Sequence, residues 1–344
     1  YRSGPEGAVK DYGFDEAYNN SEINNQLPEL LKGRDRVFYP VGKNTGLDQN
    51  IIEWIKTAKS KDRHSSAIDI ADATSKVGNQ RLIKDPHEID LMKKACRISA
   101  ESHVEAMKFV KPGMTEQEME AFYLYEFAKR GGRFSAYTPI VAGGENACVL
   151  HYVENSKPLL DGDLLLVDAG CEYDFYASDI TRTFPVSGKF TDAQLAIYEV
   201  VLEAESKAIA AVSVNNNVMD AQIISEKVVT QGLIDLEILK GSLDDLHAKG
   251  AFKEFYMHKI GHWLGIDVHD AGDYMEDDQF MQFKPGMVTT IEPGIYIPSS
   301  ANVDDKWKGI GIRIEDDILV TPDGNENLTE FVPSDPKEIE ALMA

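Results

Sequence analysis

The sequence has little cysteine and little positive charge. Its three cysteines, Cys96, Cys148 and Cys171, stand far apart without a CxxC spacing. This pattern argues against a disulfide scaffold or a zinc knuckle and predicts a reducing, cytoplasmic setting. Only 35 Lys and Arg residues stand against 58 Asp and Glu, so the formal net charge is −23. Such a chain repels nucleic-acid phosphates and anionic lipid, and we expect neither as a partner.

Long apolar runs are also missing. No stretch approaches the roughly 18 apolar residues that span a bilayer, so no membrane segment is expected. No signal-peptide pattern is visible, although the chain opens at Tyr1 without a methionine and a leader could have been removed. The excess acid can serve solubility, or part of it can be concentrated to hold cations. The positions of the carboxylates decide between these two explanations.

What is present is enough for one large domain or two ordinary ones, because 43% of the 344 residues are hydrophobic. Residues 1–84 are polar and mixed, with short helices expected over 21–32, where Ser21 is the cap, and over 50–59. This segment has too little core to fold alone, and we assign it to a small accessory domain. Residues 85–344 alternate helices with strands, which predicts an α+β domain.

Helix signals are clearest in the second domain. Pro86 opens a helix that Pro112-Gly113 stops. Thr115 with Glu118, and Thr191 with Gln194, resemble capping boxes that begin helices to about Arg130 and Val212. Apolar runs predict strands over 164–167, 287–291 and 311–320.

Two aspartates lie on a predicted hairpin within 164–184. If Tyr173 and Asp174 form its turn, opposed residues have numbers that sum to 347, as 168 and 179 do. Asp168 and Asp179 would then face each other about 5 Å apart, where two carboxylates repel and require a cation. The alternative is a different register, or an aspartate that faces water, because sequence sets hairpin register only loosely.

Three of the eight histidines fall within twelve positions: His258, His262 and His269. A lone histidine is usually structural or solvated. Three in an apolar setting, at successive offsets of 4 and 7, indicate metal binding or proton transfer. Lys259 stands where HExxH needs glutamate, so the helix-borne zinc protease motif is absent.

Two glutamates lie on or at the end of apolar strands. Glu292 directly precedes a Pro-Gly turn, and Glu315 shares a strand face with Arg313 by the period of two. A lone buried glutamate costs on the order of several kcal/mol unless it is paired or coordinated. Arg313 could pair with Glu315 but leaves Glu292 without a partner.

These four carboxylates and one histidine form a hard, oxygen-rich set. It suits a pair of divalent ions such as Mn²⁺ better than a lone zinc. Two ions about 3.5–4 Å apart can bridge a hydroxide and hold a carbonyl oxygen, which is the chemistry of amide hydrolysis.

Several segments, in this order, closely resemble bacterial Xaa-Pro aminopeptidase (aminopeptidase P): IVAGGENACVLHYVEN, VDAGCEY, SDITRTFPV, GHWLGIDVHD, TIEPGIY and GIGIRIEDDILVTPDGNENLT. The resemblance covers nearly the whole chain. That family has the pita-bread fold shared with prolidase, methionine aminopeptidase and creatinase. The resemblance thus implies an α+β pita-bread domain over 85–344, preceded by a partial α/β N-terminal domain. Relatives carry a larger N-terminal domain, of which residues 1–84 resemble only the later part.

The resemblance also implies an activity and a role for each residue. The enzyme would release the first residue of peptides with proline second, through a hydroxide that bridges two Mn²⁺ ions. Asp168 would bind one ion, His262 and Glu292 the other, and Asp179 and Glu315 both. Glu292 would also act as general base, His151 as proton shuttle and His269 as the group that stabilises the tetrahedral intermediate. The residues expected to position substrate are His258, Tyr274, Tyr296 and Arg313.

Some alternatives stay open within this resemblance. A prolidase would cleave only Xaa-Pro dipeptides, while a metal-free binding module conflicts with the five filled ligand positions. Flat walls for the proline ring are expected from His258, Trp263 and Tyr296. Lys259-Ile260-Gly261 replaces the small residues expected between His258 and His262. A homo-oligomer, dimer or tetramer, is expected as in the family.

Overall fold

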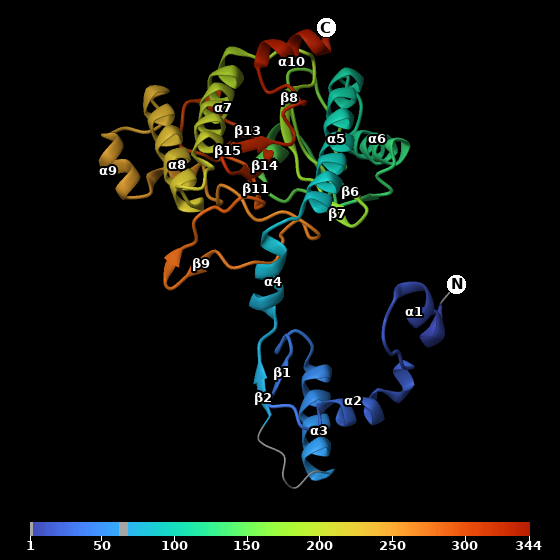
Figure 1. Ribbon diagram of the computed structural model, residues 1–344. Helices are drawn as coiled ribbons and strands as arrows, with labels where there is room; N and C mark the ends of the chain where they lie inside the picture. The colour runs from blue at the N-terminus through green and yellow to red at the C-terminus, as the bar shows by residue number, and fades with distance from the viewer. Residues whose placement is uncertain (1–2, 62–67) are drawn as a thin grey trace. The chain divides into compact units, whose positions relative to one another are not determined.

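The structure is a computed structural model that describes residues 3–61 and 68–344 (Figure 1). The chain divides into two compact units, Tyr1–Val77 and Gly78–Ala344. The boundary predicted from sequence, at residue 84, lies directly before the long helix α5 (Pro86–Phe109) of the second unit. Over the described residues, no helix is both long enough and apolar enough to cross a membrane.

The first unit is a small α/β arrangement around a parallel pair of strands. Strands β1 (Arg36–Phe38) and β2 (Asp69–Ala71) pair in parallel, with α3 (Thr45–Lys61) between them in the chain. The helices expected over 21–32 and 50–59 are present as α2 (Ile23–Leu31) and the longer α3, but Ser21 lies in a 3₁₀ turn and does not cap α2. Before them lie α1 (Gly4–Tyr12) and the 3₁₀ turn η1 (Asn20–Glu22). Helix α4 (Thr74–Leu82) runs across the boundary between the units.

The helices of the second unit begin largely where their capping signals predict. Asp85 and Glu88 form a capping box at α5, and Thr115 with Glu118 forms one at α6 (Glu116–Arg130). Thr191 caps α7 (Asp192–Ala211) through Gln194, as predicted. The sequence reading missed α8 (Val218–Asp235), which Asn217 caps. Two shorter helices are α9 (Leu243–Ala248) and α10 (Pro336–Met343).

Short antiparallel sheets lie between α5 and α6 on one side and α7 and α8 on the other (Figure 1). One sheet has the order β4-β5-β8, with strands Ile140–Gly143, Leu164–Asp168 and Thr181–Pro185. A second has the order β11-β14-β15, with strands Val288–Ile291, Asp316–Thr321 and Gly324–Asn327. The remaining pairs are β12 (Gly294–Ile297) with β13 (Ile310–Arg313), and β9 (Met275–Glu276) with β10 (Gln279–Phe280). A further sheet has the order β3-β6-β7, with strands Phe134–Ser135, Cys171–Tyr173 and Tyr176–Ala177.

The single strand expected over 311–320 is two strands, β13 and β14. The first ladder ends after Ile314, because the next amide, that of Glu315, bonds to strand β8 of another sheet. Ile314 N–H donates to Pro293 O, and Glu315 N–H donates to Thr181 O at 3.0 Å. Glu315 therefore lies at the junction of two sheets.

The hairpin register predicted for the two aspartates is wrong by two residues. Asp174 and Phe175 have positive φ (47° and 73°), so they, rather than Tyr173 and Asp174, are the central turn residues. Opposed residues now sum to 349, and Asp168 pairs with Thr181. A shift of two residues keeps every side chain on its face. Asp179 is therefore a diagonal neighbour of Asp168 on the same face.

Candidate metal centre and active site

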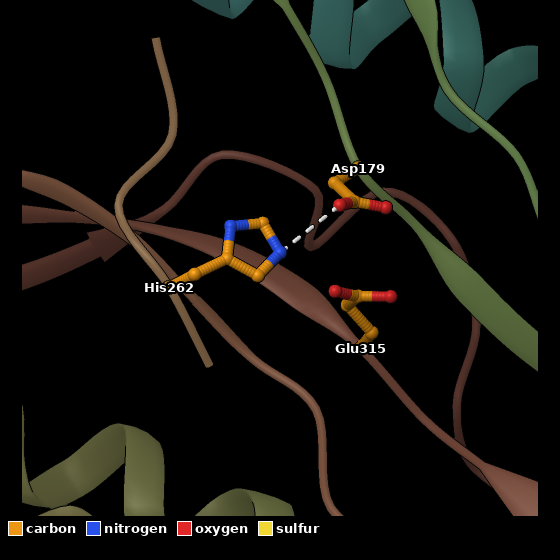
Figure 2. Close-up of side chains that lie close together, drawn as sticks. All are labelled: Asp179, His262 and Glu315. Atoms are coloured by element: carbon orange, nitrogen blue, oxygen red, sulfur yellow. Dashed lines mark ion pairs between the residues drawn. The ribbon is translucent and has the colours of Figure 1, made fainter. Parts of the chain in front are cut away.

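Three of the five predicted metal ligands point toward one another in Figure 2: Asp179, His262 and Glu315. Their ligand atoms all lie within 4.8 Å of one another. His262 Nε2 is 3.4 Å from Asp179 Oδ2 and 3.8 Å from Glu292 Oε1. Its Nδ1 donates to the carbonyl of Trp263 at 3.0 Å, which directs Nε2 to the carboxylates as in metal-binding imidazoles.

Asp168 joins the group through a shared tyrosine. The Tyr137 hydroxyl lies 2.6 Å from Asp168 Oδ1 and 2.5 Å from Asp179 Oδ1. A hydroxyl has one hydrogen and can donate to only one of the two oxygens. The second short contact, between the Tyr137 oxygen and the other carboxylate oxygen, receives no hydrogen from Tyr137 and requires a further positive charge nearby. All five predicted ligands line one cavity.

The raised pKa values of the carboxylates also indicate that further positive charge is needed at this site. Burial, together with the charges of Asp179 and Asp168, raises the pKa of Glu292 to about 7 against the opposing effect of His262 and Arg313. Burial and the charge of Asp168 raise the pKa of Asp179. Burial also raises the pKa of Glu315 well above its usual range. For His262, burial lowers the pKa, but Asp179 and Glu292 outweigh it and raise the pKa to about 9. These carboxylates hold more negative charge than the protein neutralises.

The sequence left open that Arg313 pairs with Glu315. In the structure Arg313 forms no direct ion pair with Glu315. Its guanidinium donates to Asp168 Oδ2 at 2.7 Å and to the Tyr296 hydroxyl at 2.9 Å. Glu315 instead accepts from the Thr181 hydroxyl at 2.5 Å. A set of four carboxylates and one imidazole is hard and oxygen-rich, and it fits divalent cations.

The three histidines predicted for substrate and proton chemistry also line the cavity. The His269 ring meets His262 edge-on, with centroids 4.2 Å apart. His258 has a pKa lowered to about 4 by burial and by Arg313, so it is neutral. Its Nδ1–H donates to Lys259 O at 2.8 Å, and its Nε2 therefore accepts from the Tyr296 hydroxyl at 2.8 Å. His151 stands exposed at the rim.

The cavity itself can hold a peptide segment. Its volume is about 1090 Å³, at the upper end of the usual range for ligand pockets. Apolar side chains from three segments line it away from the carboxylates: Leu150, Val153, Val218, Met219 and Phe280. A polar reaction centre thus opens into an apolar chamber.

The second unit of the chain matches a known protein family. The model of metallopeptidase family M24 matches residues 90–322. This chain belongs to that family. A curated relative, the Xaa-Pro aminopeptidase of Haemophilus influenzae, is 45% identical over 342 residues, which cover 99% of this chain and 77% of the relative.

Solved structures agree with the family assignment. The Pseudomonas aeruginosa aminopeptidase PepP superposes with a TM-score of 0.96 at 45% identity, covering 99% of this chain and 78% of that one. A Zn-substituted Escherichia coli aminopeptidase P in complex with product gives a TM-score of 0.95 at 43% identity, with 100% and 78% coverage. The predicted resemblance to aminopeptidase P and the pita-bread fold are confirmed. This M24 chain is a metallopeptidase, and its use of divalent metal is supported by the family and by the ligand cluster.

The segment between His258 and His262, where this M24 chain departs from the expected small residues, is firmly held. A Cβ at Gly261 would lie 1.9 Å from Thr290 O, so only glycine fits. Ile260 is buried; its N–H donates to Gln222 Oε1 and its carbonyl accepts from Glu292 N–H, both at 2.7 Å. The larger side chain at 260 therefore points into the core, and the backbone lies against β11.

The prediction that Trp263 forms a wall of the substrate pocket is wrong. Trp263 is 1% exposed and stacks on Tyr274 with centroids 5.0 Å apart. Tyr274 lines the cavity, and its hydroxyl accepts from Trp263 N–H at 2.9 Å. The ring of Tyr296 is also buried and reaches the site only through its hydroxyl.

Several residues that hold the predicted ligands in place were not themselves predicted. Besides Tyr137 and Thr181, Asp317 accepts from Asp179 N–H at 3.0 Å, and Arg182 donates to Glu315 O at 2.8 Å. Arg182 and Asp317 lie within three residues of predicted ligands in the chain, yet nothing in their spacing indicates these contacts. Tyr137 comes from a loop 31 positions before Asp168.

Proposed function

We propose that this chain is an Xaa-Pro aminopeptidase that removes the first residue of peptides whose second residue is proline. The observation that carries the proposal is the convergence of four carboxylates and His262 in one cavity. Chain-long similarity to proteins named Xaa-Pro aminopeptidase supports it and favours it over a prolidase.

We further propose two divalent ions, Mn²⁺ by preference. Asp168 would hold one ion, His262 and Glu292 the other, and Asp179 and Glu315 both. When bound, such a pair supplies an activated water and polarises the scissile carbonyl. Glu292 takes the proton of the attacking water. His269, beside His262, hydrogen-bonds the developing oxyanion, and His151 at the rim moves a proton to or from the leaving group.

The chemistry of the proline bond suits this arrangement. A bond to proline is a tertiary amide without an N–H, and the ring fixes φ near −65°. Enzymes that hold the scissile N–H therefore fail on it, whereas metal activation of water does not use that group. His258, fixed by Tyr296 and the Lys259 carbonyl, offers a neutral, flat side for the ring. The carboxylates favour a free α-amino group on the substrate.

The deciding experiment compares kcat/KM for Ala-Pro-Ala, Ala-Ala-Ala, Ala-Pro and N-acetyl-Ala-Pro-Ala. We expect Ala-Pro-Ala to be cut at least as well as Ala-Pro, with little action on the other two. A strong preference for Ala-Pro would make the chain a prolidase, and equal rates on Ala-Pro-Ala and Ala-Ala-Ala would refute the proline requirement. Chelation should abolish activity, with Mn²⁺ restoring it best among divalent ions.

A further inference from the structure

The position of His269 depends on its loop rather than on bonds to its own ring. Across residues 3–61 and 68–344, the structure shows no hydrogen bond to the His269 imidazole, whose ring contact is with His262. Asp267, two residues before it, and Asp270, the residue after it, both have ion-pair partners. Whatever holds these aspartates therefore holds His269.

Two cations meet at Asp270. Lys84 Nζ lies 3.1 Å from Asp270 Oδ2, and Arg81 contacts Asp270 Oδ1. The side chains of Asp270 and Lys84 are 1% and 2% exposed. The same Arg81 nitrogen also donates to Asp267 Oδ2 at 2.8 Å. The Arg81 guanidinium therefore contacts the loop on both sides of His269: Asp270 in the interior and Asp267 at the surface.

The backbone around this clamp is built for close approach. A Cβ at Gly265 would lie 2.2 Å from Asp270 Oδ2, so glycine leaves room for the carboxylate. A Cβ at Gly272 would lie 2.3 Å from Leu82, which packs against that backbone. Asn79 exchanges hydrogen bonds with Asp273, from its Nδ2 at 2.9 Å and to its Oδ1 at 3.0 Å. The segment 78–84 and the loop 265–273 fit one another along their length.

Buried ion pairs contribute little net stability, because desolvation offsets the attraction between the charges. A rigid arrangement of a buried carboxylate between two cations does fix geometry, since moving either partner leaves an unpaired charge. We propose that Arg81 and Lys84 are positioning residues that act through Asp270, and in the case of Arg81 also through Asp267, to hold His269 over the metal centre. This inference rests on the role of His269 in the proposed function.

A double-mutant cycle tests the inference in the full chain loaded with Mn²⁺. Its members are wild type, Arg81→Gln, His269→Ala and the pair together, assayed on Ala-Pro-Ala. Misplacement of a catalytic group by about 1 Å can cost about 10²-fold. We expect Arg81→Gln to lower kcat at least about tenfold, with KM and metal content unchanged, and to cause no further loss in the His269→Ala background. The matched control is Arg97→Gln, whose ion pair with Glu101 lies on the outer face of α5 and should leave activity intact.

Additive losses, loss of metal in Arg81→Gln, or full activity of Arg81→Gln would each overturn the clamp while leaving the proposed function intact. If Arg81→Gln does not fold, Arg81→Lys keeps the charge but places it on a shorter side chain without the planar guanidinium, and the same outcomes apply. A wild type that cuts no Xaa-Pro peptide would refute the proposed function instead. In that case the imidazole NMR signal of His269 in the Zn²⁺-loaded protein tests the clamp without substrate. It should broaden or shift in Arg81→Gln and not in Arg97→Gln, and an unchanged signal in Arg81→Gln overturns the inference.

Discussion

In the proposed function, the side chains around the cavity divide into carboxylates that hold the cations and imidazoles that transfer protons. His262 belongs with the carboxylates, because its Nε2 faces Asp179 and Glu292. His269 touches only the edge of His262, and His151 stands at the rim. Removing His151 or His269 should therefore leave the ligand set complete.

We expect His151→Ala and His269→Ala each to keep full metal content. Each should lower kcat by about 10²–10⁴-fold with a much smaller change in KM, as for other acid–base and oxyanion groups. Metal analysis of the purified variants beside steady-state kinetics on Ala-Pro-Ala checks this. A variant that loses metal would show that its histidine is a ligand.

A different histidine, His103, makes stability depend on pH. It is fully buried; its Nε2–H donates to Ala169 O and its Nδ1 accepts from the Tyr123 hydroxyl, both at 3.0 Å. Burial lowers its pKa from 6.5 to about 4. The unfolded chain therefore takes up a proton first as pH falls, and stability is lost between pH 6.5 and 4, with no effect above.

The corresponding prediction compares wild type with His103→Gln, which cannot titrate. Between pH 7.5 and 5, the free energy of unfolding of wild type should fall by about 2 kcal/mol more than that of the variant. Urea unfolding followed by circular dichroism at the two pH values measures it. Equal falls in the two proteins would mean that His103 is not held neutral by the fold.

At the scale of elements, the contact between the 258–263 segment and β11 places His262 beside Glu292. Thr290 N–H donates to His262 O at 2.9 Å, and Glu292 N–H donates to Ile260 O at 2.7 Å. Gly261 permits this approach, because any Cβ there would collide with Thr290 O.

Gly261→Ala should therefore separate the two elements. We expect a loss of stability of about 1–3 kcal/mol, as in other overpacked sites, together with weaker metal binding. Gly46→Ala in α3 is the matched control, because the nearest atom to its Cβ, apart from its chain neighbours and the helix backbone, is Asn44 Oδ1 at 3.4 Å. Thermal unfolding and metal titration of both variants provide the comparison, and unaltered metal affinity in Gly261→Ala would contradict the prediction.

Elements were predictable from sequence where local chemistry decides them. The capping boxes at Thr115 and Thr191 bond within one helical turn, so their residues are visible at fixed spacing. The hairpin turn was predicted one residue too early, because Phe175 takes a positive φ, which is uncommon for a bulky residue and is not indicated by the sequence. The prediction that both aspartates lie on the same face of the sheet was still correct, because a register shift of two residues leaves each side chain on its face.

At the scale of the whole chain, the convergence of the predicted ligands on one cavity was predictable from sequence, and the contacts that support them were not. The predicted ligands lie in recognisable motifs, and a buried carboxylate costs free energy unless it is paired or coordinated. Tyr137, Arg182 and Asp317 act only through distant contacts, such as the bond from Asp179 N–H to Asp317. No local pattern encodes such a contact, because the fold brings its partners together across 138 positions of the chain.

The same long-range assembly links metal binding to the stability of the protein. Without cations, the repulsion and burial that raise the pKa values of Asp179 and Glu315 oppose folding. With Mn²⁺ at 100-fold above its Kd, binding to the folded state stabilises by about 2.7 kcal/mol, which for a unit of this size raises Tm by roughly 5–8 °C. The double variant Asp179→Asn/Glu315→Gln keeps the shape of both side chains but removes their charge. Calorimetry should find it more stable than wild type in the presence of chelator and unresponsive to Mn²⁺, so that the order of the two Tm values reverses when metal is added. A Tm of the double variant that still rises with Mn²⁺ would show that these two carboxylates are not where the ions bind.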